Sequence, residues 1–175
     1  MEDLFWIGFV GAAIALLFAW LQRSRVMSFS EGNEKMRKIA ASIREGANAY
    51  LKHQYTTVFK VFLVVFILLL IIAFGSGGKM LSQFTPFAFL TGGIWSMLAG
   101  LVGMKIATNA NARAAEGARQ GVRPAFLIGF RGGAVMGLAV VGFSLLGVCG
   151  VLWLAGDSSI LLGFSFGASS LALFA

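Results

Sequence analysis

Charged residues, cysteine, histidine and proline are all scarce in this sequence of 175 residues. One cysteine, one histidine and two prolines are present, and charged side chains make up only 12% of the chain. The lone Cys149 cannot form an internal disulfide, and the apolar run around it indicates a small core residue. The lone His53 has no second metal ligand near it in the sequence, which favours a structural role.

Acidic residues are too few for metal-dependent phosphate chemistry. Seven are present, whereas Mg²⁺-dependent reactions of phosphates need several carboxylates that converge on one site. The sequence also contains no helix with paired carboxylates, no cluster of His and Cys, and no GxxxxGK phosphate loop. We therefore expect no catalytic residue and no metal ligand in this chain.

Hydrophobic residues, by contrast, make up 58% of the chain, and its mean hydropathy is +0.86. Soluble domains carry about 25% charged residues, so the composition predicts an all-α, polytopic membrane protein. Apolar runs predict one transmembrane region, residues 1–175, with five spans at about 4–21, 58–74, 87–106, 125–154 and 160–175. The fifth run is shorter than the ~20 residues of a helical span, which indicates the N-terminal part of a longer protein.

Basic residues gather in two segments. Thirteen of the fourteen lysines and arginines lie in residues 22–60 and 105–131, and only Lys79 lies elsewhere. Because basic flanks of membrane spans stay on the cytoplasmic side, we expect an outer N-terminus and cytoplasmic segments at 22–57 and 107–124. The net charge of +7 follows from this pattern and does not indicate nucleic acid as a partner.

Two helical patterns each run through a polar and an apolar segment without a break. One runs from about Met36 to Phe74, and the other from Gly92 to Gly121, where the sequence GVRP stops it. The amphipathic half of the first could lie flat on the membrane, but the absence of a breaker favours a rigid extension into the cytoplasm. The second we interpret as one helix leaving the membrane. On spacing alone, a tightly packed span with a charged flank is the simpler alternative.

Small residues recur at every fourth position in two apolar runs, a spacing that lets helix backbones approach closely in a bilayer. These helix-packing candidates are Gly92, Ser96, Gly100, Gly129, Gly133 and Gly137. Arg131 lies inside the fourth span, where an arginine is a candidate functional residue. Its place near the cytoplasmic end favours a snorkelling side chain instead.

Four segments, residues 31–58, 103–121, 130–138 and 163–175, carry a resemblance to a known family. They resemble the start of the membrane-bound, ion-translocating inorganic pyrophosphatases, which couple pyrophosphate hydrolysis to the pumping of H⁺ or Na⁺. The resemblance covers roughly the first quarter of a family member. It implies that the first four spans belong to an outer ring of helices and the fifth to an inner ring.

The resemblance also implies cofactors and partners. Mg²⁺ would be bound by residues outside this chain, with K⁺ or Na⁺ as further cations. The partners would be pyrophosphate, the lipid bilayer, the remainder of the pump subunit and a second subunit in a homodimer. Ser169 becomes a candidate for the ion pathway, whereas its spacing from Ser165 fits helix packing equally well. Family members continue past the position of Ala175 with an arginine and a Gly-rich helix that carries Lys and Asp, so this chain alone should be inactive.

Two other functions fit parts of the pattern. A non-catalytic helical scaffold or assembly protein would use the same glycine stripes to hold other spans. A fragment of a secondary transporter is less favoured, because the sequence has no pair of broken helices and no buried acid. The residues after Ala175 would discriminate: an Asp-rich helix favours the pump, and a genuine stop favours the scaffold.

Overall fold

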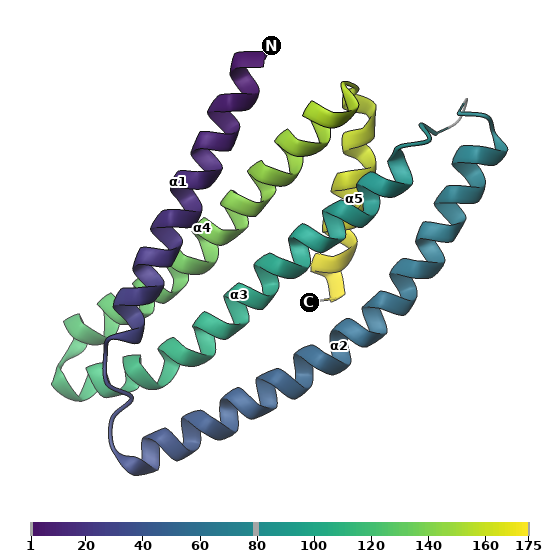
Figure 1. Ribbon diagram of the computed structural model, residues 1–175. Helices are drawn as coiled ribbons and strands as arrows, with labels where there is room; N and C mark the ends of the chain where they lie inside the picture. Colours follow the sequence, from purple (N-terminus) through teal and green to yellow (C-terminus); the bar gives the residue numbers. More distant parts are fainter. Residues whose placement is uncertain (1, 79–80, 175) are drawn as a thin grey trace. The chain divides into compact units, whose positions relative to one another are not determined.

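The computed structural model describes residues 2–78 and 81–174, which form five α-helices and one short 3-10 helix (Figure 1). In chain order these are α1 Glu2–Met27, α2 Glu34–Gly75, α3 Thr85–Gln120, α4 Val122–Ala155, η1 Ser158–Ile160 and α5 Leu161–Phe174. No strand occurs in the described ranges, so the predicted all-α class is confirmed. Lys79, and Ala175 at the end of the fifth predicted span, lie outside the described residues.

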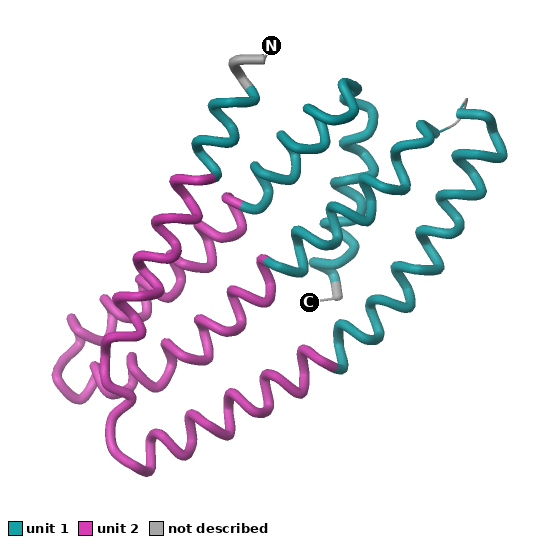
Figure 2. Tube along the Cα trace, viewed as in Figure 1, with its two compact units in different colours: residues 1–12, 53–98, 143–175 teal, residues 13–52, 99–142 magenta. Residues whose placement is uncertain are grey.

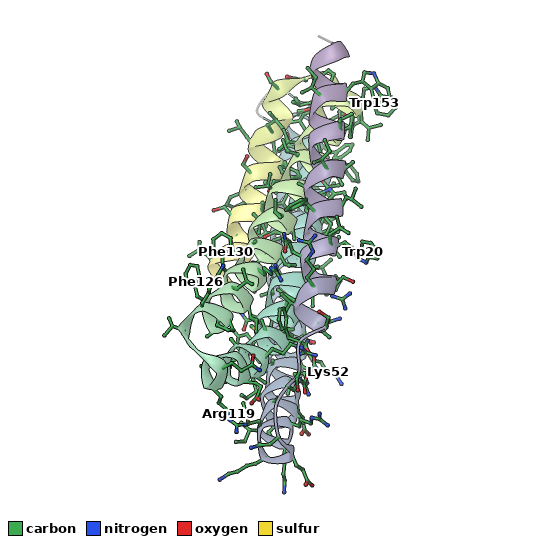
Figure 3. The ribbon with its side chains drawn as sticks, turned by 90° about the vertical axis from the view of Figure 1, so that its left-hand side faces the viewer. Trp20, Lys52, Arg119, Phe126, Phe130 and Trp153 are labelled. Carbon is green, nitrogen blue, oxygen red and sulfur yellow. The ribbon has the colours of Figure 1, made fainter. Side chains whose placement is uncertain are left out.

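Four of the helices are long and apolar enough to cross a membrane: α1, α2, α3 and α4. Helix α5 is apolar but has only 14 residues, fewer than the ~20 that a full span needs. Large apolar side chains are exposed along the helices, and Figure 3 shows Trp20, Phe126, Phe130 and Trp153 projecting away from the ribbon. Such exposure suits lipid rather than water, and the chain is a polytopic helical membrane protein.

Helices α2 and α3 are longer than a bilayer is thick. They contain 42 and 36 residues, which at ~1.5 Å per residue exceeds the ~30 Å hydrocarbon core by a wide margin. Both predicted unbroken helices are confirmed. Helix α2 begins at Glu34, slightly before the predicted Met36, because the side chain of Asn33 accepts a hydrogen bond from the Met36 amide (3.0 Å) and caps the first turn.

A single residue separates α3 from α4. Gly121 adopts a φ of 139°, a backbone conformation that residues other than glycine rarely adopt. Helix α4 then starts at Val122, a few residues before the predicted span at about Ala125. Pro124 fits in the first turn because the amide that it lacks would have no helical acceptor there. The predicted break at GVRP is therefore confined to its glycine.

The helices divide into two compact units (Figure 2), each with a core of its own. Unit 1 comprises residues 1–12, 53–98 and 143–175, and unit 2 comprises residues 13–52 and 99–142. The buried residues of unit 1 include Val58, Phe62, Ala88, Phe89, Ile160, Phe164 and Leu171. The core of unit 2 is made by Ala19, Val26, Ile106, Ala110, Ile128 and Val135. Small and medium apolar residues in unit 2 let α1, α3 and α4 pack closely.

Candidate functional site

Helix α5 packs on α3 in unit 1 through glycines on both helices. A Cβ atom on Gly167 would overlap the carbonyl oxygen of Phe89, and one on Gly92 would overlap the carbonyl oxygen of Phe164. Gly163 lies in the same way against Thr85. Thr85 meets Gly163, Phe89 meets Gly167, and Gly92 also lies close to the amide nitrogen of Ala168. The helices α3 and α5 therefore run in the same direction where they touch. Gly92, one of the predicted packing residues, lies at this close approach.

Aromatic rings fix the same pair of helices against α2. The rings of Phe62 on α2 and Phe89 on α3 stack with centroids 4.7 Å apart, and Phe166 of α5 lies 5.4 Å from Phe89. Leu171 of α5 is buried in the same cluster. Aromatic pairs of this kind add about 0.5–1.5 kcal/mol to the burial of their area. Helix α5 is thus positioned along much of its length.

Ser169, the predicted ion-pathway candidate, is exposed on the opposite side of α5. At ~100° per residue, Gly163 and Gly167 share one face, and Ser165 and Ser169 lie roughly half a turn away. Within the described residues, neither serine has a hydrogen-bond partner in another helix. The stripe of Ser165 and Ser169 therefore makes no packing contact here, and the part of Ser169 in ion transport stays a prediction.

The other predicted packing glycines have open space around them. A Cβ atom on Gly129, Gly133 or Gly137 would find no atom of a neighbouring element within 4 Å. The contact of α4 with α3 is made one position away, by Gly132, whose Cβ would lie 3.0 Å from the Cβ atom of Ala110. These three glycines therefore do not carry the α3–α4 contact. Packing against another helix stays a prediction for them, as it does for the half-buried Ser96 and Gly100.

An ion-pair cluster in unit 2 connects the α1–α2 loop to two helices. Oε1 of Glu31 in the loop lies 2.8 Å from Nη1 of Arg44 on α2 and 2.9 Å from Nη1 of Arg113 on α3. Arg113 also donates to the carbonyl oxygens of Phe29 (3.0 Å) and Asn109 (2.7 Å). The Arg113 side chain is only 8% exposed, so its three acceptors, on Glu31, Phe29 and Asn109, satisfy a nearly buried charge.

The two guanidinium groups make Glu31 a stronger acid. The hydrogen bond from Arg44 lowers the pKa of the Glu31 carboxyl, burial partly offsets this, and the charge of Arg113 lowers the pKa further. This cluster was not predicted from the sequence. The i, i+4 spacing of Asn109 and Arg113 was a usable indication. The contact of Arg113 with Phe29 spans 84 residues and has no local pattern.

The remaining titratable residues in the described part of the chain do not form a metal site. Among the residues that the structure describes, no three His, Cys, Asp or Glu side chains lie together as metal ligands. His53 is exposed, and Arg131 is half-buried on α4. Cys149 is buried, and a Cβ atom on Gly8 of α1 would overlap its sulfur atom. The contacts of the described residues position the helices and leave the side of α5 that carries Ser165 and Ser169 exposed.

Comparison with known proteins gives a consistent family. Residues 13–175 match the family model described as inorganic H⁺ pyrophosphatase. Over its whole length, the chain is 40% identical to a "K(+)-insensitive pyrophosphate-energized proton pump" of Methanosarcina mazei, and the match covers 25% of that protein. It is also 42% identical, over 98% of its length, to 25% of a "putative K(+)-stimulated pyrophosphate-energized sodium pump" of Bacteroides thetaiotaomicron. The chain spans about a quarter of the length of these curated relatives.

Proposed function

Because the chain belongs to the inorganic H⁺ pyrophosphatase family, we propose that it forms the N-terminal part of a pyrophosphate-energised cation pump. The pump would couple the hydrolysis of pyrophosphate to the movement of H⁺ or Na⁺ across the membrane. The observation that carries this proposal is the 40% identity that extends over the entire chain to a named proton pump. The four long apolar helices support it, because a pump must span the bilayer.

The chain would be oriented with its N-terminus outside and with residues 22–57 and 107–124 in the cytoplasm. The support is the thirteen-to-one distribution of basic residues. In this orientation the Glu31 cluster lies on the cytoplasmic side, where α2 and α3 continue beyond the membrane. The cluster would hold the α1–α2 loop against these two extensions.

Within the pump, α1–α4 would belong to an outer ring of helices and α5 to an inner ring. Ser169 would then face the ion pathway. The support is its exposure on the side of α5 that is turned away from Gly163 and Gly167. Replacing Ser169 by Ala in the full-length pump should lower the number of ions moved per pyrophosphate hydrolysed. An unchanged ratio would remove Ser169 from the pathway.

Hydrolysis would depend on Mg²⁺ held by residues outside this chain, in a subunit that pairs with a second copy. The chemistry supports the first point, since metal-dependent attack of water on a phosphate needs converging carboxylates. The names of the relatives mention both K⁺-insensitive and K⁺-stimulated pumps, and both H⁺ and Na⁺, at closely similar identity. Overall identity therefore does not discriminate between these cations.

The test compares the purified 175-residue chain with a full-length protein that contains it. Both would be assayed for Mg²⁺-dependent release of phosphate from pyrophosphate, and the full-length protein for ion uptake in vesicles. We expect hydrolysis and uptake by the full-length protein and none by the chain alone. A folded full-length protein that does not hydrolyse pyrophosphate would refute the pump, and hydrolysis by the chain alone would show that it contains a site.

A further inference from the structure

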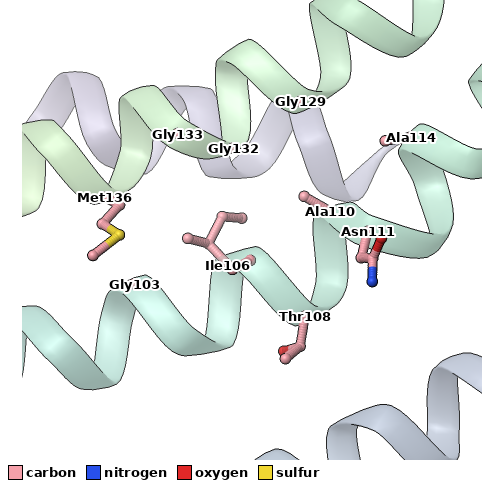
Figure 4. Close-up of a pocket in the computed structure, with 11 residues that line it drawn as sticks. Gly103, Ile106, Thr108, Ala110, Asn111, Ala114, Gly129, Gly132, Gly133 and Met136 are labelled. Carbon is pink, nitrogen blue, oxygen red and sulfur yellow. The ribbon is translucent and has the colours of Figure 1, made fainter. Parts of the chain in front are cut away.

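An open groove runs between α3 and α4 in unit 2 (Figure 4). It has a volume of about 470 Å³ and is lined by seven residues of α3, between Gly103 and Ala114, and by four of α4, between Gly129 and Met136. Backbone forms much of its surface: Gly129 and Gly133 are exposed, with no atom of a neighbouring element within 4 Å of a Cβ position. Ala107 and Asn111 are the exposed small residues on the α3 side.

The two helices cannot close this groove by moving together. They already touch beneath it, where Gly132 leaves only 3.0 Å between its Cβ position and the Cβ atom of Ala110. The buried Ile106 fills the space beside this contact. The groove is therefore a lasting feature of the helix pair, and its atoms lack packing partners on one side. Atoms that line such a groove lack dispersion contacts, and a side chain or helix that fills the groove supplies them.

The lining of the groove fits a helix better than a small polar ligand. Only Thr108 and Asn111 bring polar side chains to it, and the Thr108 hydroxyl already donates to the carbonyl oxygen of Met104 (2.9 Å). Glycine and alanine at helical spacing let another helix backbone approach closely, and an Asn side chain can hydrogen-bond across such a contact. The expected occupant is an apolar helix with branched aliphatic side chains on one face.

We infer that the occupant is a membrane helix from the part of the pump subunit that lies outside this chain. This inference rests on the proposed function. The relatives are about four times as long as the matching segment, so most of the subunit must pack against surfaces of this kind. The groove runs from the apolar Gly103 and Met136 to Asn111, beside the charged end of α3. The occupant therefore continues, like α3, from an apolar into a polar environment.

Photo-crosslinking in the full-length pump tests this inference. A benzophenone-maleimide probe would be attached to Ala107→Cys, in a background without other cysteines, and the products mapped by mass spectrometry. We expect adducts within one subunit to an apolar helix beyond residue 175. Adducts to lipid alone, or to a second copy at dimer mass, would overturn the inference. The same probe on Phe130→Cys, on an exposed face of α4 outside the groove, calibrates the detection of lipid adducts.

A size substitution gives an independent readout. Gly133→Leu should lower the melting temperature of the full-length pump and leave that of the 175-residue chain unchanged, because the new Cβ atom has no atom of a neighbouring element within 4 Å in the chain and points into the open groove. Equal melting temperatures of variant and wild type in the full-length pump would count against the occupant. Pyrophosphate hydrolysis by the wild type, measured on the same preparation, separates the two ideas. If the full-length protein is active but gives lipid adducts alone, the proposed function stands and the docking site is refuted. If it is inactive but gives the internal adduct, the docking site stands and the proposed function is refuted.

Discussion

Gly167 of α5 lies directly against the backbone of Phe89 on α3, with no room for a side chain between them. Backbone rather than a flexible side chain forms the opposing surface, so an added methyl group cannot be accommodated by a rotamer change. The position of α5, and with it the direction in which Ser169 faces, depends on this contact.

Replacing Gly167 by Ala should therefore destabilise the packing of unit 1. Overpacking a tight contact lowers the free energy of unfolding by about 1–3 kcal/mol, which thermal unfolding in detergent would detect. The matched control is Gly150→Ala on α4, where the new methyl group would meet open space. If both variants melt at the same temperature, the close approach of α3 and α5 does not exist in solution.

Removing the charge of Glu31 should destabilise unit 2. The Glu31→Gln variant leaves the nearly buried Arg113 without its carboxylate partner, and hydrogen bonds to charged groups contribute about 1.5–3 kcal/mol. Glu34→Gln is the control, because Glu34 is exposed and forms no ion pair within the described residues. A double-mutant cycle with Arg113→Met would measure the coupling. Additive effects of the two substitutions would show that the pair contributes nothing.

The contribution of Glu31 should depend on pH in one direction. Its pKa in the folded protein is below the ordinary value of 4.5, so the unfolded chain binds a proton more readily than the folded one. The stabilisation is therefore complete above about pH 5.5 and declines as the pH falls below 4.5 through the folded pKa. The stability difference between wild type and Glu31→Gln, measured across this range, should shrink in acid. A difference that grows in acid would mean that the carboxyl is protonated in the folded state.

The proposed orientation can be tested by labelling single cysteines in a Cys149→Ala background. A membrane-impermeant maleimide added from outside should react with Asp157→Cys and not with Arg119→Cys. Arg119 is preferable to Arg113 as the inner position, because their side chains are 61% and 8% exposed. Permeabilised membranes provide the control, since both positions should then react. The opposite labelling pattern would invert the topology.

Sequence reasoning captured the features that repeat along one helix. The unbroken course of α2 and α3 follows from the lack of proline at their polar–apolar boundaries, and the spacing of Gly92 made it a packing candidate. The same spacing drew attention to Gly129 and Gly133, whereas Gly132 makes the contact with α3. Periodicity shows that a helix has a face of small residues, but the choice of face depends on its neighbours. The Glu31–Arg113 pair could not be predicted, because its two residues meet only after the α1–α2 loop has packed against α3.

The one-residue connection at Gly121 also limits how α3 and α4 can move. A single residue extends by at most ~3.6 Å, which is less than the 5.4 Å pitch of an α-helix. The close contact of Gly117 with Ala125 and Ile128 on the two sides of the connection takes up what slack there is. The connection is therefore too short for α4 to slide past α3 by one helical turn. As long as both helices stay intact, the register of this hairpin is fixed.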